Sequence, residues 1–374
     1  MTLKRVLYIV SILATVVGLY GIFLRLTTGH QNAAYGSYVV WGLWVAMYLF
    51  FVGITAGAVV LASLDYVLHL PLFRGTGRLS LVLALITLGA GLFHIWLDLG
   101  HLERIWKVYL QGNPFSVMAQ IVFGYTLLGL LVLVALYLSF RKPEGTILKW
   151  LLTLSIPLAL FLSGGVGALL GVQAARLFWH VGLFPAQFPV FSLASGVAVL
   201  LMVLGFFWDR RDPRLPQMLL VLGISSVVLQ VVKLYFLWAD FSQSLYGGVP
   251  HNVQAVQEVL FGPYWWAFWF GQVLIGGLLP IAVLSQPRLA RNPLWAGWMG
   301  AAILLGFAIA RANIVFPALT VPELAALTTA FSDPRLEYRY FPSLMEWAVT
   351  VGITGAAGLA FLLAERWLPL VQVE

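Results

Sequence analysis

Long apolar segments alternate with short polar connections along the whole chain. Because an α-helix needs roughly 20 apolar residues to cross a bilayer, the pattern predicts ten spans, at residues 6–26, 38–64, 79–99, 115–140, 148–174, 187–208, 216–239, 263–285, 293–316 and 342–366. We therefore expect an all-α, polytopic transmembrane helix bundle that forms one integral membrane domain over residues 1–374. The first segment follows Lys4 and Arg5 like a signal peptide, but it is long and no small-residue cleavage site follows it, so we expect it to remain as a helix.

Composition agrees with a lipid bilayer as the surrounding medium. Hydrophobic residues make up 61% of the 374 residues and charged residues only 9%, which is more apolar surface than a soluble core needs. The net charge of +7 lies in short loops rather than in one patch, so it does not indicate nucleic-acid binding. Cysteine is absent, which excludes disulfides, thiolate zinc sites and iron–sulfur clusters bound by this chain alone.

The loops carry a charge bias that predicts orientation. With ten spans both termini lie on one side, and that side holds thirteen Lys and Arg residues against six on the other. Positive charge accumulates on the cytoplasmic side of membrane proteins. The count therefore predicts cytoplasmic termini.

Four outer connections are long and mix aromatic residues, Pro, Gly and charge: about 100–114, 175–186, 240–262 and 317–341. Ordered loops on one face of a bundle are typical of a docking surface for a partner. The alternative is a set of interfacial caps with an aromatic belt.

An internal repeat is also indicated. Asn113-Pro-Phe-Ser before the fourth span resembles Gly262-Pro-Tyr-Trp before the eighth, 149 residues later. Spans two to five and six to nine would then be tandem parallel four-helix units, at residues 35–174 and 187–316, with residues 342–366 as a final helix.

Six charged or titratable residues lie within or at the ends of the predicted spans: Asp65, His94, Asp98, Lys233, Arg311 and Glu346. All except Asp65 fall toward the outer side, and His101, Asn113 and His180 lie in adjoining outer loops. Helical spacing also places His94, Asp98 and His101 on one face. Because charge in an apolar segment is costly, the shared depth predicts one polar pocket at the outer side.

Each of these residues also has a structural explanation. Arg311 and Lys233 could extend their charges to the outer headgroups, and Glu346 could close a capping box with Ser343. His94 could be a packing histidine, and Asp98 could cap backbone donors or pair with a loop arginine. Asp65 could anchor the inner boundary.

The pattern favours some ligands over others. Haem needs paired axial histidines, and only His94 lies well inside a span. His94, Asp98 and His101 have workable metal spacing, but no second ligand set completes a site. A transporter would show broken helices near the midplane. A quinone fits, because its oxygens need hydrogen-bond donors in one redox state and proton acceptors in the other.

Two segments near the start of the chain carry a family likeness: the second span, from Tyr35 to Ala58, and Asp98-Leu-Gly-His-Leu-Glu-Arg-Ile-Trp106 followed by Asn113-Pro-Phe-Ser-Val-Met118. The first resembles the second helix, and the second resembles the next signature, of the NrfD/PsrC family of quinone-reactive membrane anchor subunits. Arg311-Ala-Asn313 and Tyr340-Phe-Pro-Ser-Leu-Met-Glu346 are similar to the end of the longer, ten-helix members, including a hydrogenase anchor of the HybB type and DsrP-type subunits. At position 101 the family often has Arg, whereas this chain has His.

The resemblance implies a membrane subunit of a respiratory oxidoreductase complex in a bacterial or archaeal cytoplasmic membrane. It implies menaquinone or ubiquinone as substrate, with no haem and no iron–sulfur cluster in this chain. A ferredoxin-like subunit with four-iron clusters would dock on the outer face and connect to a catalytic subunit, a molybdopterin enzyme or a hydrogenase.

The site residues follow from the same expectation. Asp98 and His94 would exchange protons with the quinone head group, and His101, Asn113 and His180 would contact it. Lys233, Arg311 and Glu346 would lie behind the site or along a proton path. The alternatives are a proton-linked solute transporter and a purely structural anchor.

Overall fold

The computed structural model describes residues 3–324, 326–331, 333 and 335–370, and within them it contains helices and no strand. Among these residues, ten helices are long and apolar enough to cross a membrane, which confirms the predicted bundle. They are α1 (Leu3–Thr28), α2 (Leu43–Tyr66), α3 (Thr76–Asp98), α5 (Val117–Arg141), α6 (Thr146–Gly171), α7 (Phe184–Phe207), α8 (Leu215–Gly247), η3 with α10 (Ala267–Leu278 and Leu279–Leu284), α12 (Pro293–Thr320) and α14 (Leu344–Trp367).

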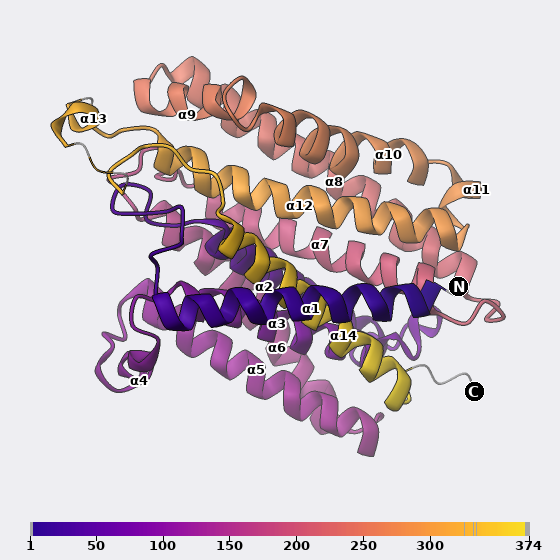
Figure 1. The fold of residues 1–374 in the computed structure, drawn as a ribbon. Coiled ribbons are helices and arrows are strands. Elements are labelled where there is room, and N and C mark those ends of the chain that lie inside the picture. Colours follow the sequence, from indigo (N-terminus) through magenta and orange to yellow (C-terminus); the bar gives the residue numbers. More distant parts are fainter. Residues whose placement is uncertain (1–2, 325, 332, 334, 371–374) are drawn as a thin grey trace.

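Short helices occupy the connections: η1 (Pro71–Phe73), η2 (Leu102–Arg104), α4 (Lys107–Gln111), α9 (Pro250–Leu260), α11 (Pro287–Ala290) and α13 (Leu327–Ala330). In Figure 1, α4, α9 and α13 lie at one end of the bundle, and α1 begins and α14 ends at the other. We call the first the loop end and the second the terminal end.

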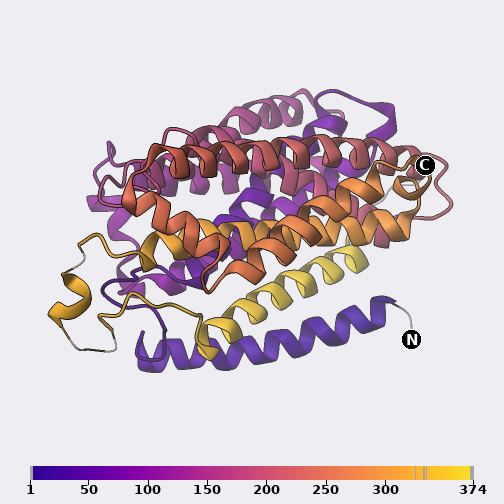
Figure 2. The same ribbon diagram turned by 90° about the horizontal axis from the view of Figure 1, so that it is seen from above.

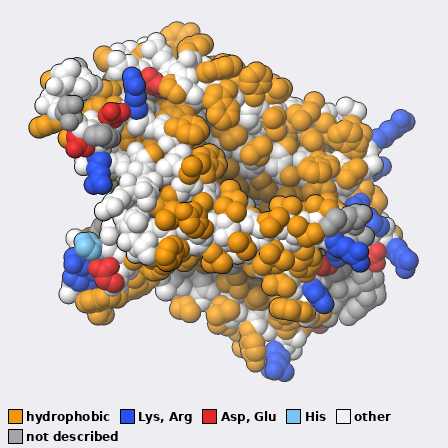
Figure 3. All heavy atoms as spheres, viewed as in Figure 1, with side chains coloured by type: hydrophobic (Ala, Val, Ile, Leu, Met, Phe, Trp, Pro, Cys, Tyr) orange, Lys and Arg blue, Asp and Glu red, His pale blue; other side chains and the backbone are white. Residues whose placement is uncertain are grey.

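The molecular surface has the distribution expected of a membrane protein. Figure 3 shows a broad band of hydrophobic side chains between two ends where the charged side chains gather. Because apolar side chains can face lipid without cost, the exposed apolar surface of α1 and α5 needs no partner.

The two sets of four helices have the same neighbours. In the first set α2 packs on α3 and α6, and α5 packs on both of these; in the second set α7 packs on α8 and α12, and α10 packs on both of these. Helices α2 and α7 also contact each other, and both are largely buried. A tandem repeat of residues 35–174 and 187–316 would have these relations, and the repeat stays a prediction.

Helices α1 and α14 form a separate pair along one edge of the bundle (Figure 2). Their backbones touch where Gly18 meets Gly352, and a Cβ atom at Gly21 would lie 2.9 Å from the Val349 nitrogen. Small residues allow this close approach between membrane helices. The pair places the end of α1 beside the end of α3.

One predicted boundary is wrong. The seventh span was expected to end at residue 239, with a loop from residue 240, but α8 continues to Gly247. The segment from Asp240 to Gly247 mixes polar and apolar residues and has no helix breaker before its final glycine, so the helix extends past the apolar run. Asp240 is therefore a buried helix residue and not a loop acid.

Candidate functional site

Helix α3 presents His94 in the interior near the loop end. The imidazole is fully buried and lies parallel to the Phe51 ring, with centroids 5.4 Å apart. Nδ1 lies 2.8 Å from the Ala90 carbonyl oxygen, so this nitrogen must carry the proton that it donates. Nε2 is then an acceptor, and it has no partner among the described residues.

Asp98 ends the same helix one turn further on. Its Oδ1 atom is buried and has no hydrogen-bond partner in the described part of the chain. Tyr35 lies in the connection between α1 and α2, close enough for the Asp98 charge to act on its hydroxyl. The pKa of Tyr35 is raised, first by burial and then by the charges of Asp98 and Glu346. The Tyr35 hydroxyl is likewise buried, and it lies beside the Asp98 carboxyl group but outside normal hydrogen-bond geometry with any described residue.

His30 completes this group. Its ring meets the Tyr35 ring edge-on, with centroids 5.4 Å apart, and its Nε2 atom is buried without a described partner. Burial, followed by the nearby Arg25 charge, lowers the pKa of His30. Four buried polar atoms that no described residue bonds in normal geometry, from His30, Tyr35, His94 and Asp98, thus lie at one end of the bundle. We call these four residues the orphan cluster.

Arg25 anchors the cluster from α1. Its Nε donates to the Leu97 carbonyl oxygen at 2.8 Å and its Nη2 to the Leu99 carbonyl oxygen at 2.6 Å. The last carbonyls of a helix have no intrahelical partners and carry the negative end of the helix dipole. A buried guanidinium is therefore stabilised there, and it also places positive charge beside Asp98.

Glu346 forms the opposite wall and is fully bonded. Its carboxylate closes a capping box at Ser343 and accepts from the backbone nitrogen of Ala34 at 2.9 Å. It also accepts from the Tyr340 hydroxyl and, at 3.4 Å, from the Leu43 nitrogen. The geometry thus agrees with the structural explanation of Glu346, which is a capping box with Ser343. Its carboxylate ties the connection before α2 to the start of α14.

Arg311 lies elsewhere in the bundle. Its guanidinium carbon sits 3.9 Å from the centre of the Phe188 ring, and Nη1 is buried without a described partner. A Cβ atom at Gly53 would lie 3.6 Å from Arg311 Nη2. Gly53 and Phe51 are two residues apart on α2 and so face different sides of it. Helix α2 therefore separates Arg311 from His94. Lys233, on α8, is further into the second four-helix set.

The remaining predicted residues are on the surface of the loop end. His101 is exposed beside Glu103, with Nδ1 3.1 Å from Oε1. Asn113 is exposed and accepts from the Phe115 nitrogen at 2.9 Å, which forms a turn before α5. His180 is exposed, and its Nδ1 lies 2.7 Å from the Gly171 oxygen. The expectation of one shared pocket is therefore corrected: the eight predicted residues occupy three places, because α2 divides the interior and these three side chains bond locally.

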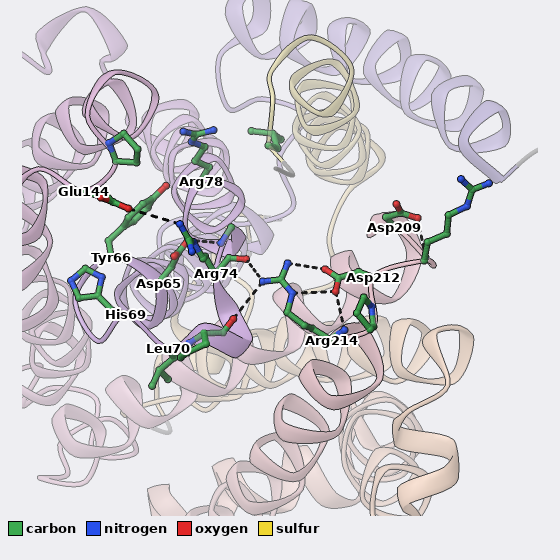
Figure 4. A pocket seen from close by; sticks show the side chains of 16 residues that line it. Asp65, Tyr66, His69, Leu70, Arg74, Arg78, Glu144, Asp209, Asp212 and Arg214 are labelled. Atoms are coloured by element: carbon green, nitrogen blue, oxygen red, sulfur yellow. Dashed lines mark hydrogen bonds and ion pairs between the residues drawn. The ribbon is translucent and has the colours of Figure 1, made fainter. Parts of the chain in front are cut away.

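A cavity of about 750 Å³ opens at the terminal end, between the connections that follow α2, α5 and α7 (Figure 4). Asp65 accepts from the backbone nitrogens of Gly75 and Gly77 at 2.9 and 3.0 Å, and so caps the start of α3. Arg214 pairs with Asp212 at 2.9 Å and donates to the carbonyl oxygens of neighbouring loop residues. These contacts explain Asp65 as an anchor of this boundary.

In the described ranges no three His, Cys, Asp or Glu side chains come together in a way that could hold a metal ion. The chemistry available at the orphan cluster is hydrogen bonding and proton exchange. The cluster offers an acceptor nitrogen on His94, one turn before a buried carboxylate oxygen on Asp98, and a phenol on Tyr35 close to that carboxylate.

A model of the family described as polysulphide reductase, NrfD, matches residues 27–323. The chain belongs to the NrfD family. It is 30% identical to a selenate reductase subunit from Mesobacillus selenatarsenatis, over all of this chain and 96% of that protein. It is 26% identical to the Hdr-like menaquinol oxidoreductase integral membrane subunit of Archaeoglobus fulgidus, over 98% and 93% of the two chains. The menaquinone reductase integral membrane subunit of Nitratidesulfovibrio vulgaris is 25% identical over 96% and 89%.

Three residues of the site were not predicted from the sequence. Arg25 was counted only as an outer positive charge, and His30 received no role. Tyr35 was noted only as the start of a family-like segment. A lone arginine at the end of an otherwise apolar span was the signal available for Arg25.

Proposed function

We propose that this NrfD-family chain is the quinone-reactive membrane subunit of a respiratory oxidoreductase complex, and that the orphan cluster binds the quinone head group. The observation that carries the proposal is the set of four buried, unpartnered polar atoms. Leaving a buried polar atom unpaired costs about 1–3 kcal/mol each, so such a cluster is best explained by a polar ligand. The menaquinol and menaquinone in the names of two relatives support a quinone as that ligand.

Each residue of the cluster would have a role that its hydrogen-bonding atoms allow, as a proton acceptor or as a hydrogen-bond donor. A quinol loses two electrons and two protons when it becomes a quinone. His94 Nε2, an acceptor, would receive one proton and the Asp98 carboxylate the other, while Tyr35 would donate to a quinone oxygen. In the opposite direction the same atoms would return the protons. The electrons would pass to or from a cluster in a partner subunit.

The loop end would carry that partner. Several large apolar side chains are exposed there: Leu110, Phe115, Tyr246, Phe261, Phe331 and Phe341. Exposed apolar groups beside ordered loops support a docking surface, and we propose a four-iron ferredoxin-like subunit as its occupant. With thirteen positive side chains on the other side, the loop end would face outward from the cytoplasmic membrane, with both termini inside.

The test is an Asp98→Asn substitution in the assembled complex, because this change removes the charge and keeps the shape. Hydrogen bonds to charged groups contribute about 1.5–3 kcal/mol, so we expect quinol-linked turnover to fall roughly 10- to 150-fold at unchanged subunit stoichiometry. Glu103→Gln, an exposed acid at the same end, is the matched control.

Three outcomes separate the candidate functions. Loss of turnover with the iron–sulfur partner retained supports the proposal and rejects a purely structural anchor. Full turnover in Asp98→Asn rejects the assignment of Asp98. Solute uptake by vesicles that contain this chain alone would instead favour a proton-linked transporter.

A further inference from the structure

A second group of buried polar side chains lies in the other four-helix set. Helices α7, α8, η3 and α12 enclose a small cavity of about 30 Å³. Five polar residues line it, each less than 8% exposed: Gln187, Lys233, Asp240, Gln272 and Asn313. Because polar side chains this deep in a membrane bundle are costly, five at one cavity call for an explanation of their own.

The hydrogen bonds inside this group are incomplete. Asn313 donates to Gln272 Oε1 at 2.8 Å, and Lys233 Nζ donates to the Gly276 carbonyl oxygen at 3.0 Å. Lys233 also lies 4.8 Å from the centre of the Phe307 ring. The Asp240 carboxyl group forms no hydrogen bond with any described residue. A buried carboxyl group therefore faces the cavity without a protein partner.

Lys233 and Asp240 do not pair directly, since no ion pair joins these two described residues and Lys233 Nζ donates to the Gly276 carbonyl oxygen instead. They are seven residues apart on α8, which is about 10 Å along the axis. A void needs roughly 10–15 Å³ to hold one water molecule, so this cavity has room for about two. Water is thus the ligand that fits this cavity. A quinone head group is far too large for it, since pockets for small-molecule ligands begin at about 300 Å³.

The local backbone favours the same arrangement. Segment η3 is a π-helix, a form that is concentrated at functional sites. Its Gly276 packs against the Gly306 backbone of α12, which brings the Gly276 carbonyl oxygen within reach of Lys233. Lys233 is also the nineteenth residue of α8, as His94 is of α3. The two four-helix sets thus each carry a buried ionisable residue at the same position.

We propose that this cavity is a second, hydrated site, in which one or two water molecules join Asp240 to Lys233 and allow a proton to exchange between them. When the proton of the Asp240 carboxyl group passes through the water to a neutral Lys233 amine, the carboxylate that remains is balanced by the Lys233 ammonium that forms. The site does not depend on the proposed quinone function, because its residues lie on the far side of α2 from the orphan cluster.

Radiolytic hydroxyl-radical labelling of the intact complex tests the hydration. Phe191 and Phe241 line the cavity and Phe184 is a fully buried aromatic residue of α7 that does not. We expect at least fivefold faster labelling of Phe191 and Phe241 than of Phe184, and loss of the difference in Asn313→Leu, which fills the cavity. Equal labelling of the three residues in the native complex would overturn the hydrated site.

Infrared spectra and stability measurements test the proton exchange and the pairing. The bands of Asp240, identified by their loss in Asp240→Asn, should shift when H₂O is replaced by D₂O; bands that stay in place would overturn the exchange. Lys233→Met alone should lower the Tm, and adding Asp240→Asn should restore part of the loss. A double variant whose Tm falls by the sum of the two single effects would contradict a water-joined charge pair. Asp65→Asn, which removes a carboxylate outside this cavity, is the control.

Discussion

The close contact between α1 and α14 sets the position of Arg25, so a single methyl group at this contact should disturb the candidate site. Gly21 lies one turn before Arg25 on the same face of α1. A Cβ atom at Gly21 would lie 2.9 Å from the Val349 nitrogen and 3.0 Å from the Ala348 Cβ. Gly21→Ala therefore forces α1 away from α14.

The size of the displacement follows from contact distances. Carbon atoms pack at about 3.5–4.0 Å, so α1 must move by about 0.5–1 Å. The Arg25 bonds to the α3 carbonyls, now 2.8 and 2.6 Å, would then stretch or break. Overpacking costs about 1–3 kcal/mol, while replacement of a helical glycine by alanine returns about 1 kcal/mol. The expected net destabilisation is about 0–2 kcal/mol.

Function should respond more strongly than stability. A misplacement of about 1 Å at a reacting group can lower a rate 100-fold, and Arg25 lies beside Asp98. We expect quinol-linked turnover of the Gly21→Ala complex to fall about 10- to 100-fold, while the Tm falls by only a few degrees. Turnover and differential scanning fluorimetry on the same purified complex give both numbers.

Gly89→Ala is the matched control, because Gly89 is also a glycine in a spanning helix but a Cβ atom there meets nothing within 4 Å. Gly89→Ala changes helix propensity as Gly21→Ala does, but it does not change the packing between helices. If the Gly21 and Gly89 variants have the same turnover, then Arg25 does not couple the α1–α14 contact to the orphan cluster.

Three further changes test other parts of the structure. Glu346→Gln replaces an acceptor of several hydrogen bonds by a group that is half donor, so about 2–6 kcal/mol of stability should be lost; an unchanged Tm would contradict the bonded wall. Asn113→Ala removes only an exposed turn contact and should cost less than about 1 kcal/mol with turnover retained, and a large loss of turnover would restore Asn113 to the site. Because burial and the Arg25 charge lower the pKa of His30, the unfolded chain takes up this proton first; stability should be complete above about pH 6.5 and fall as the pH drops from there toward the folded pKa. Thermal scans of His30→Asn against pH should lack that part of the decline.

The bundle itself was predictable because its signal is local. Each span is a run of apolar residues whose length is set by the bilayer, and nine of the ten predicted spans end close to the observed helices. Span seven was shortened because Asp240 interrupts the apolar run, whereas the backbone continues as a helix to Gly247. Hydropathy reports where lipid contact ends and does not report where backbone hydrogen bonding ends.

The site was only partly predictable, because the sequence indicates how deep a residue lies in the membrane but does not indicate which neighbouring helix it faces. His94, Lys233 and Arg311 were expected to lie within spans, and all three are buried, since charge inside an apolar run has few other places to go. Which side of α2 each faces depends on the packing of α7 and α12 against it, and no local pattern specifies this packing. His101 and Asn113 share sequence motifs with Asp98 but lie beyond the end of α3, where the chain turns to the surface.

Asp98 and Glu346 show why hydrogen bonding, and not residue type, points to the candidate ligand site in this protein. Both are acids at the loop end, and both act on the Tyr35 hydroxyl. The Glu346 carboxylate is filled by donors from its own capping box and from the connection before α2, so it can accept little more. Asp98 keeps a buried oxygen without a described partner, and the nearest cation, Arg25, is already committed to two carbonyl oxygens. A buried acceptor that the fold leaves open must be satisfied from outside the fold. The same isosteric change should therefore act on different quantities, on stability at Glu346 and on quinol turnover at Asp98.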